Sequence, residues 1–291
     1  MEVDRALAVG GVALHYRLSR SGGSRPPLVL LHGVASNLTR WSEFVEQTTL
    51  KASRDLVRVD LRGQGGSLTR TRIGMERWSD DLVAILDAEG YSQAVLVGHS
   101  LGANLSVHFA HRHPSRVAGL GLIDPVLLEA LHGRARLVGR IAPLARPLIA
   151  ALLRLNRLGL HRRRVRPLDL RALDEATRKK VLATGRPDAL LRRYGSPFAD
   201  VRFVPTATYL QDVVELVRPL PPLAEIGAPV LALLSTGITF TDLEETARLL
   251  RALPRVEIER IDAYHWPLTE KPADVRAAIE RWCVGLPAGS A

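Results

Sequence analysis

The sequence predicts an α/β fold: a mostly parallel central sheet, helices flanking both of its faces, and a helical cap inserted into the sheet domain. Three observations support this prediction. Short apolar runs typical of strands buried on both faces recur along the chain, helical stretches separate several of them, and about a hundred residues without a clear strand interrupt the alternation. The apolar runs occupy residues 28–31, 56–59, 94–97, 117–123, 230–234 and 256–261.

The chain opens with an expected β-hairpin and continues with helices between the strands. Residues 3–18 alternate apolar and polar side chains about Gly10 and Gly11, which is the pattern of two antiparallel strands joined by a tight turn. Glycine and proline are frequent where helices end. We expect helices at 75–89, closed by Gly90, at 101–111, closed by Pro114, and at 243–253, closed by Pro254.

The long interruption of the alternation predicts a cap that is helical and basic. Leucines recur within it at roughly helical spacing, at positions 144, 148, 152 and 155. Residues 132–202 hold 18 Lys and Arg against 5 Asp and Glu, so this segment carries more than the whole net charge of +10. We assign residues 126–218 to the cap, and residues 1–125 and 219–291 to the sheet domain.

Composition limits the class of protein. The single cysteine, Cys283, excludes an intramolecular disulfide, and the start Met1-Glu2-Val3-Asp4 lacks the basic and apolar character of a secretion signal. No stretch reaches the ~20 apolar residues that a transmembrane helix needs. We therefore expect a cytoplasmic protein with no transmembrane segment.

The segment with the most specific chemistry is Gly98-His99-Ser100-Leu101-Gly102, which joins an apolar strand to a helix. In this context the pattern G-x-S-x-G is typical of a nucleophile elbow. The glycines let strand and helix approach closely, and the turn raises the serine hydroxyl above the sheet in a strained conformation. We predict that Ser100 is a catalytic nucleophile.

A second loop lies at the end of the strand that precedes His32-Gly33-Val34. Such a loop can turn backbone N–H groups toward a developing oxyanion, and the first amide of a helix also favours negative charge. We predict that the amides of Val34 and Leu101 form an oxyanion hole. We expect His32 to stabilise the loop by hydrogen bonds.

Together these motifs resemble the α/β-hydrolase superfamily, in its serine-nucleophile, capped, esterase- or lipase-like branch. Residues 60–67 resemble the family's D-x-R-G-x-G-x-S turn. Residues 263–267, followed by Glu270-Lys271-Pro272, resemble its histidine loop, with Tyr264 where glycine is usual. The resemblance implies that His265 is the base that takes the proton of Ser100. It covers nearly the whole chain outside the cap.

The acidic member of the expected triad departs from the family pattern. The usual motif G-x-x-D falls on residues 235–238, where Ile238 replaces the aspartate. Two replacements are available: Asp124, at the strand end directly before the cap, where some superfamily members place their acid, and Asp242, in the loop after Ile238. A chain with no functional acid is the third alternative, and the sequence leaves all three open.

The resemblance implies a cofactor-independent serine hydrolase that acts on an ester or related acyl compound through an acyl-enzyme, with neither cofactor nor metal. Thioester and carbon–carbon bond hydrolysis use similar parts and stay open. The alternative is a non-hydrolytic ligand- or partner-binding protein that has lost the usual acid.

The expected partner is a small acyl molecule with an apolar moiety, and the arginines of the cap would suit a carboxylate or phosphate on it. The run 161–166 is basic but lacks interleaved aromatic residues, so we expect no nucleic acid. Weak contact of the cap with an anionic membrane stays an alternative. The sequence does not determine the oligomeric state.

Overall fold

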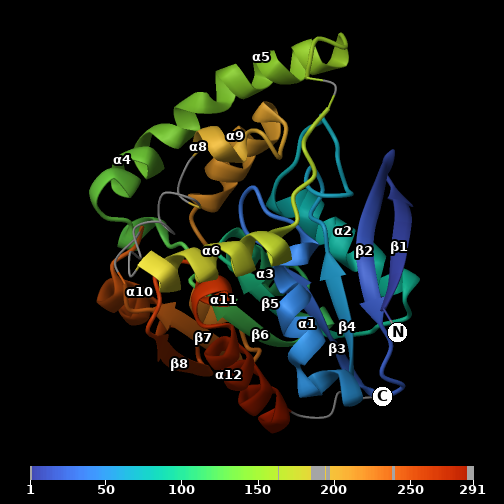
Figure 1. Cartoon of the computed structure of the whole chain (residues 1–291), viewed down its shortest axis with the longest axis vertical. Coiled ribbons are helices and arrows are strands. Elements are labelled where there is room, and N and C mark those ends of the chain that lie inside the picture. The colour runs from blue at the N-terminus through green and yellow to red at the C-terminus, as the bar shows by residue number, and fades with distance from the viewer. Residues whose placement is uncertain (1, 163, 185–193, 195–196, 238–239, 287–291) are drawn as a thin grey trace.

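The computed structural model describes residues 2–162, 164–184, 194, 197–237 and 240–286 (Figure 1). Within these residues, eight strands form one sheet in the order β1-β2-β4-β3-β5-β6-β7-β8. From β4 to β8 in this order, neighbouring strands are parallel. β2 pairs antiparallel with β4 on one side and with β1 on the other. The strands are β1 (Glu2–Val9), β2 (Val12–Ser19), β3 (Arg25–Leu31), β4 (Arg54–Val59), β5 (Ala94–His99), β6 (Val117–Ile123), β7 (Val230–Ser235) and β8 (Val256–Ile261).

The predicted hairpin and strand–helix alternation are confirmed. β1 pairs with β2 in register from Val9 opposite Val12, and Gly10 and Gly11 both have positive φ, which fits the tight turn. The expected helices between the strands are present, with ends shifted by a few residues. The helices of the sheet domain are α1 (Ser42–Gln47), α2 (Met75–Ala88), α3 (Leu101–Arg112), α10 (Leu243–Leu250), α11 (Pro267–Glu270) and α12 (Pro272–Gly285).

Two apolar cores lie on opposite faces of the sheet, because successive strand side chains alternate between the faces. Leu28 and Leu30 of β3 pack with residues of α1 and α12, and Val29 and Leu31 pack with residues of α2, α3 and α10. Strands β3 to β7 are therefore covered on both sides, as predicted.

The prediction that residues 256–261 are buried on both faces is wrong. Within the described residues β8 pairs with β7 alone and forms the edge of the sheet, and its side chains are half-buried or exposed except for the buried Ile261. Glu257, Glu259 and Arg260 occupy this strand, and charged residues at a sheet edge discourage pairing with another chain.

The chain leaves the sheet after β6 and returns at β7, and the described elements between them are helices. Figure 1 shows these helices gathered on one side of the sheet, beyond the ends of its strands. They fall within the predicted cap, 126–218. The cap helices are α4 (Gly133–Ile141), α5 (Arg146–Arg157), α6 (Leu170–Thr184), α8 (Pro197–Asp200) and α9 (Thr206–Leu216), with a 3₁₀ turn, η5 (Ala142–Ala145), between α4 and α5.

A buried ion pair joins the cap to the sheet domain. Arg40, in the 3₁₀ turn η1 (Leu38–Trp41), donates from Nη1 to both carboxylate oxygens of Asp174 in α6 at 2.7 Å. Both residues are less than a tenth exposed. Arg40 also donates to Thr269 Oγ1 at 2.6 Å, and Tyr194 donates to Asp174 at 2.5 Å. This cluster fixes α6 over the carboxyl ends of the strands.

Candidate active site

Ser100 stands at a sharp turn between β5 and α3. Its backbone has φ of 52° and ψ of −113°, a conformation that non-glycine residues rarely adopt. A Cβ on Gly98 would lie 2.2 Å from backbone atoms of Gly102, and a Cβ on Gly102 would lie 2.5 Å from the carbonyl oxygen of Leu31. Both glycines are therefore required by close backbone approach, as the elbow motif predicts.

Ser100 and His265 form a hydrogen-bonded pair. Ser100 Oγ lies 3.0 Å from Nε2 of His265, which follows β8 on the loop that leads into α11. Both side chains are buried, and burial lowers the pKa of His265 to about 4. The imidazole is therefore neutral near pH 7, so Nε2 can accept the serine proton while Nδ1 carries its own hydrogen toward Asp124.

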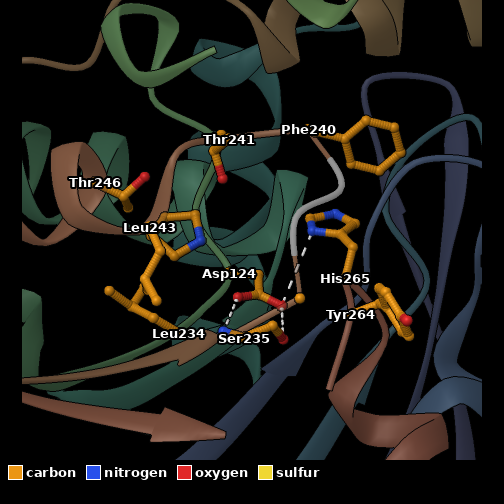
Figure 2. Close-up of a pocket in the computed structure, with 11 residues that line it drawn as sticks. Asp124, Leu234, Ser235, Phe240, Thr241, Leu243, Thr246, Tyr264 and His265 are labelled. Atoms are coloured by element: carbon orange, nitrogen blue, oxygen red, sulfur yellow. Dashed lines mark hydrogen bonds and ion pairs between the residues drawn. The ribbon is translucent and has the colours of Figure 1, made fainter. Parts of the chain in front are cut away.

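The structure brings Asp124 to the other side of the His265 ring (Figure 2). Oδ2 of Asp124 lies 3.9 Å from His265 Nδ1, which is an ion-pair distance longer than a hydrogen bond. The carboxylate also accepts hydrogen bonds from the backbone N–H of Ser235 at 2.7 Å and from its Oγ at 2.6 Å.

Burial dominates the charge state of Asp124. It raises the pKa of Asp124 to about 7, although the two hydrogen bonds from Ser235 favour the ionised form and lower the pKa in part. Asp124 also has positive φ of 45°, and its N–H donates to the carbonyl of Leu233, so β7 fixes the backbone from which the carboxylate projects.

The two candidate acids, Asp124 and Asp242, lie in different environments. Asp242 is exposed and serves as the N-cap of α10, where its carboxylate accepts the amide of Glu245 at 2.8 Å. Its carboxylate is thus directed at a helix terminus, whereas Asp124 faces the His265 ring. Ile238, which replaces the usual acid in the sequence, lies outside the described residues.

The predicted oxyanion loop lies against the elbow. A Cβ on Gly33 would meet Ser100 Cβ at 3.4 Å, and Val34 and Ser100 line the same cavity. Leu101 is the first residue of α3, so its amide has no acceptor within the helix. These positions agree with an oxyanion hole formed by the amides of Val34 and Leu101.

Side chains hold the oxyanion loop in place. His32 accepts the Leu61 amide at Nε2 and donates from Nδ1 to the Gly33 carbonyl, so the prediction that His32 stabilises the loop is confirmed. The Asp60 carboxylate accepts the amide of Leu38 at 2.7 Å, and the amide of Ser36 donates to Gln64 at 3.0 Å. The loop is thus supported from the turn that follows β4.

Two further side chains hold the histidine loop. Glu270 of α11 accepts the amides of Tyr264 and Trp266, which flank His265 on either side. Nε2 of His99 donates to the His265 carbonyl at 2.7 Å. Backbone positions on both sides of the ring are therefore fixed, which limits the motion of its Nε2 relative to Ser100.

Sequence reasoning did not identify Ser235, Glu270 or His99 as parts of the site. The sequence carries a signal for two of them: Glu270 closes the histidine-loop motif and His99 lies inside the elbow motif. Ser235 lies at the end of the apolar strand β7. It meets Asp124 only because of the register in which β7 pairs with β6.

The described residues contain one group with the composition of a metal site, His99, Asp124 and His265, whose ligand atoms lie within 4.8 Å of one another. Hydrogen bonds already engage one ring nitrogen of each histidine. Nε2 of His99 donates to a backbone carbonyl, and Nε2 of His265 pairs with Ser100. The geometry fits proton transfer better than metal ligation.

Ser100 and His265 open onto a cavity of about 610 Å³ between the sheet domain and the cap. This volume is typical of a small-molecule pocket. The cap supplies most of its apolar wall, and the sheet domain supplies the reactive groups. The apolar lining includes Val126, Leu131, Val213, Leu216, Phe240 and Trp266.

Comparison with curated proteins finds relatives of several activities. The chain is 36% identical over 129 residues to the dihydrolipoyllysine-residue acetyltransferase component of the acetoin cleaving system of Pseudomonas putida, a match covering 43% of this chain and 34% of that protein. It is 32% identical over 125 residues to 2-hydroxymuconate semialdehyde hydrolase of a Pseudomonas strain, covering 42% and 43%. These matches thus span less than half of each relative's length.

A longer match is to an sn-1-specific diacylglycerol lipase of Mus musculus, 23% identical over 269 residues and covering 91% of this chain and 83% of that protein. Among solved structures, an esterase from Thermogutta terrifontis superposes with a TM-score of 0.65 at 22% identity, covering 98% of both chains. An enol-lactonase from Burkholderia xenovorans superposes with a TM-score of 0.68 at 18% identity, covering 96% of this chain and 99% of that one.

The family model for the alpha/beta hydrolase fold matches residues 26–272, which run from β3 to the start of α12. The match includes the elbow, the histidine loop and the inserted cap. With the parallel sheet and the strained serine turn described above, it shows that the chain belongs to the α/β-hydrolase family.

Proposed function

We propose that this chain is a serine hydrolase that cleaves an ester or a related acyl compound through an acyl-enzyme. The observation that carries the proposal is the 3.0 Å contact between Ser100 Oγ and His265 Nε2 at the wall of the 610 Å³ cavity. A buried neutral imidazole beside a strained serine is the arrangement that activates a hydroxyl for attack.

In the first half-reaction, Ser100 Oγ attacks the acyl carbonyl carbon while its proton passes to His265 Nε2. The carbonyl oxygen becomes an oxyanion, which the amides of Val34 and Leu101 stabilise. As the intermediate collapses, the bond to the leaving oxygen breaks, and His265 returns the proton to that oxygen. The products are a Ser100 acyl ester and a free alcohol.

In the second half-reaction, water takes the place of the alcohol. His265 removes a proton from water as its oxygen attacks the acyl carbon, and the proton then passes to Ser100 Oγ when the acyl ester bond breaks. The carboxylic acid leaves and the enzyme is regenerated. Ionised Asp124 would stabilise the imidazolium form of His265 in both halves.

The cavity suggests the class of acyl group. Its apolar lining supports a substrate with an apolar acyl or ring moiety. Arg40 forms an ion pair with Asp174, so among the described residues that line the cavity, Arg134, at the first turn of α4, is the arginine available to a substrate carboxylate or phosphate. Relatives named as a diacylglycerol lipase and an esterase are consistent with this class.

The proposal is tested with a fluorophosphonate probe, which reacts only with an activated serine, and with a panel of short- and long-chain acyl esters. We expect the wild type to label at Ser100 and to cleave esters with apolar acyl groups. Ser100→Ala should do neither. If the wild type behaves like Ser100→Ala in both assays, the chain is not a serine hydrolase.

The acid is tested by comparing two isosteric variants. Asp124→Asn removes the charge beside His265, and we expect kcat to fall by about 10²–10⁴. Asp242→Asn keeps an oxygen that can still cap α10, and we expect it to retain wild-type turnover. Turnover of Asp124→Asn equal to that of the wild type would reject Asp124 as the acid.

The second candidate function is ligand binding without hydrolysis. The observation in its favour is that Asp124 makes both of its hydrogen bonds with Ser235 and stays 3.9 Å from His265 Nδ1. This candidate predicts that apolar esters bind with measurable affinity but are not turned over. Binding measured by calorimetry, with no acid released over hours, would support it against the hydrolase.

A further inference from the structure

The cap carries an apolar stripe that faces away from the protein. Residues 133–157 are helical almost throughout, as α4, η5 and α5, and apolar side chains recur along them at spacings of 4, 3, 4 and 7. At 3.6 residues per turn these positions fall on one side. Each is at least two-fifths exposed, up to 76% for Leu144. The stripe is Leu137, Ile141, Leu144, Leu148 and Leu155.

The stripe is separate from the face by which these helices pack onto the protein. Gly139, Ala142 and Ile149 are buried, and Ala142 belongs to an apolar cluster with Val126 and Val217. Figure 1 shows α5 as an outer layer beyond α9. Since the cap already buries one apolar face, the exposed stripe is a second one.

A basic flank runs beside the stripe. Between Glu129 and Asp169 the sequence has ten arginines and no acidic residue. Among the described residues, no carboxylate forms an ion pair with the arginines of the two helices, whereas most arginines of the sheet domain are so paired. The flank is Arg136, Arg140, Arg146, Arg154 and Arg157, all of which are exposed.

We propose that the outward face of α4, η5 and α5 is a docking surface for an anionic membrane. A helix with an exposed apolar stripe flanked by arginine lies in the headgroup region, where apolar side chains enter the acyl boundary and arginines meet lipid phosphates. The combination of side chains identifies the partner. An exposed leucine stripe alone would suit a second copy of this chain, and an arginine flank alone would suit nucleic acid. Both together suit anionic lipid.

The docking surface adjoins the mouth of the cavity. Gly133, Arg134 and Val138 of α4 line the cavity and are themselves exposed. Gly133 and Arg134 lie about one turn before Leu137, where the stripe begins, and Val138 directly follows Leu137. Membrane docking would therefore place the cavity mouth beside the lipid surface. This consequence rests on the proposed hydrolase, and it points to acyl substrates that partition into membranes.

The docking proposal is tested without hydrolysis, using Ser100→Ala so that the vesicles stay intact. We expect the protein to co-sediment with vesicles of phosphatidylcholine containing about a quarter phosphatidylglycerol, and at least about tenfold less with phosphatidylcholine alone. Raising NaCl from about 0.05 M to about 0.5 M should weaken binding, because salt screens exposed charges. Loss of esterase activity would not change this result.

Two sets of variants locate the surface. Leu144→Asn with Leu148→Asn removes apolar contact, and Arg140→Gln, Arg146→Gln and Arg154→Gln together remove charge. We expect each set to weaken vesicle binding at least about tenfold, since each arginine near an anionic surface contributes about 1 kcal/mol, or about fivefold.

The matched controls are Val284→Asn, an apolar residue 71% exposed on α12, and Arg77→Gln with Arg251→Gln, which are exposed on the sheet domain. Circular dichroism of every variant should match that of the parent. We expect the controls to bind vesicles like the parent.

Three results would overturn the proposal. The first is equal binding to vesicles with and without phosphatidylglycerol, or no binding to either. The second is a dimer in light scattering that the Leu144→Asn, Leu148→Asn variant abolishes in the absence of lipid. The third is binding of duplex DNA, lost in the arginine variants, by a protein that does not bind vesicles.

Discussion

At the scale of single residues, the chemistry depends on the ionisation of Asp124. Burial raises its pKa to about 7, while Ser235 opposes this effect with two hydrogen bonds to the ionised carboxylate. His265 has its pKa lowered to about 4 by burial, so it does not limit activity near neutrality. We therefore expect the acidic limb of kcat/KM against pH to report Asp124 and to lie near pH 7.

The Ser235 hydroxyl should set the position of that limb. In Ser235→Ala the carboxylate loses one donor, so the pKa of Asp124 rises further and the limb moves to higher pH by roughly one unit. Activity then falls most below pH 7 and recovers in alkaline buffer. The measurement is kcat/KM for one ester from pH 5 to about pH 9.

Ser235→Thr is the matched control, because it keeps the hydroxyl and should keep the wild-type limb. A uniform loss of activity in Ser235→Ala at every pH would mean that Ser235 supports the fold rather than the charge of Asp124.

At the scale of elements, the elbow is a contact between two backbones. β5 and α3 approach so closely at Gly98 and Gly102 that neither position has room for a Cβ, and the neighbouring strand β3 closes over Gly102. The strained φ of Ser100 persists because hydrogen bonds hold both sides of the turn, including that from its N–H to Ile123.

Gly102→Ala should therefore disrupt both the fold and the site. The new methyl group would stand 2.5 Å from the Leu31 carbonyl oxygen, which is backbone and cannot rotate away. We expect the free energy of unfolding in urea to fall by at least about 2 kcal/mol. Gly227→Ala, where the added Cβ meets nothing within 4 Å, should unfold like the wild type.

Elements could be predicted from sequence wherever the pattern is local. The hairpin, the strands from β3 to β7 and the elbow each follow from residues within one short segment. The position of β8 at the sheet edge could not be predicted, because strand order depends on how distant segments pair. The helical spacing of the cap leucines was predictable, but the side facing solvent depends on how α5 packs against α9.

The candidate site divides in the same way. Ser100, His265 and the loop of Val34 belong to motifs with fixed internal spacing. The choice between Asp124 and Asp242 stayed open in the sequence because it depends on where a loop folds. The bond from Ser235 to Asp124 joins residues 111 positions apart, so no local pattern contains it.

At the scale of the whole molecule, the cap and sheet domain meet across a buried carboxyl group. Asp212 of α9 is fully buried, and burial raises its pKa well above the ordinary value. The Ala35 amide lies near enough to oppose this slightly, but neither carboxyl oxygen receives a hydrogen bond of normal geometry from the described residues. In the folded protein the group therefore holds its proton at pH values where the unfolded chain has released it.

The raised pKa of Asp212 in the folded state predicts that this residue destabilises the protein as pH rises. The folded state binds the proton more tightly, so the stability associated with it is complete below about pH 4 and is lost as pH rises toward the folded pKa. Asp212→Asn cannot ionise, so its free energy of unfolding should increase relative to that of the wild type as pH rises from about 4 toward the folded pKa of Asp212.

At pH 8 we expect the free energy of unfolding of Asp212→Asn to exceed that of the wild type by clearly more than it does at pH 5, because only the wild type loses stability as the pH rises. Urea denaturation at pH 5 and pH 8 measures the difference. Asp262→Asn, whose side chain is 93% exposed, is the control and should show none. A gain for Asp212→Asn that is equal at both pH values would contradict ionisation as the cause.

The buried pair of Arg40 and Asp174 restricts how this protein can exchange its cap for that of a relative. Ser100, Asp124 and His265 all lie outside the inserted segment, so a chimera joined after Asp124 keeps the proposed chemistry. However, Asp174 belongs to the insert and Arg40 does not. A foreign cap without a carboxylate at that place would leave the buried Arg40 guanidinium without an ionic partner, which would lower the free energy of unfolding by about 3–5 kcal/mol. Recombinant caps should therefore be chosen first for this charge, and only then for their pocket.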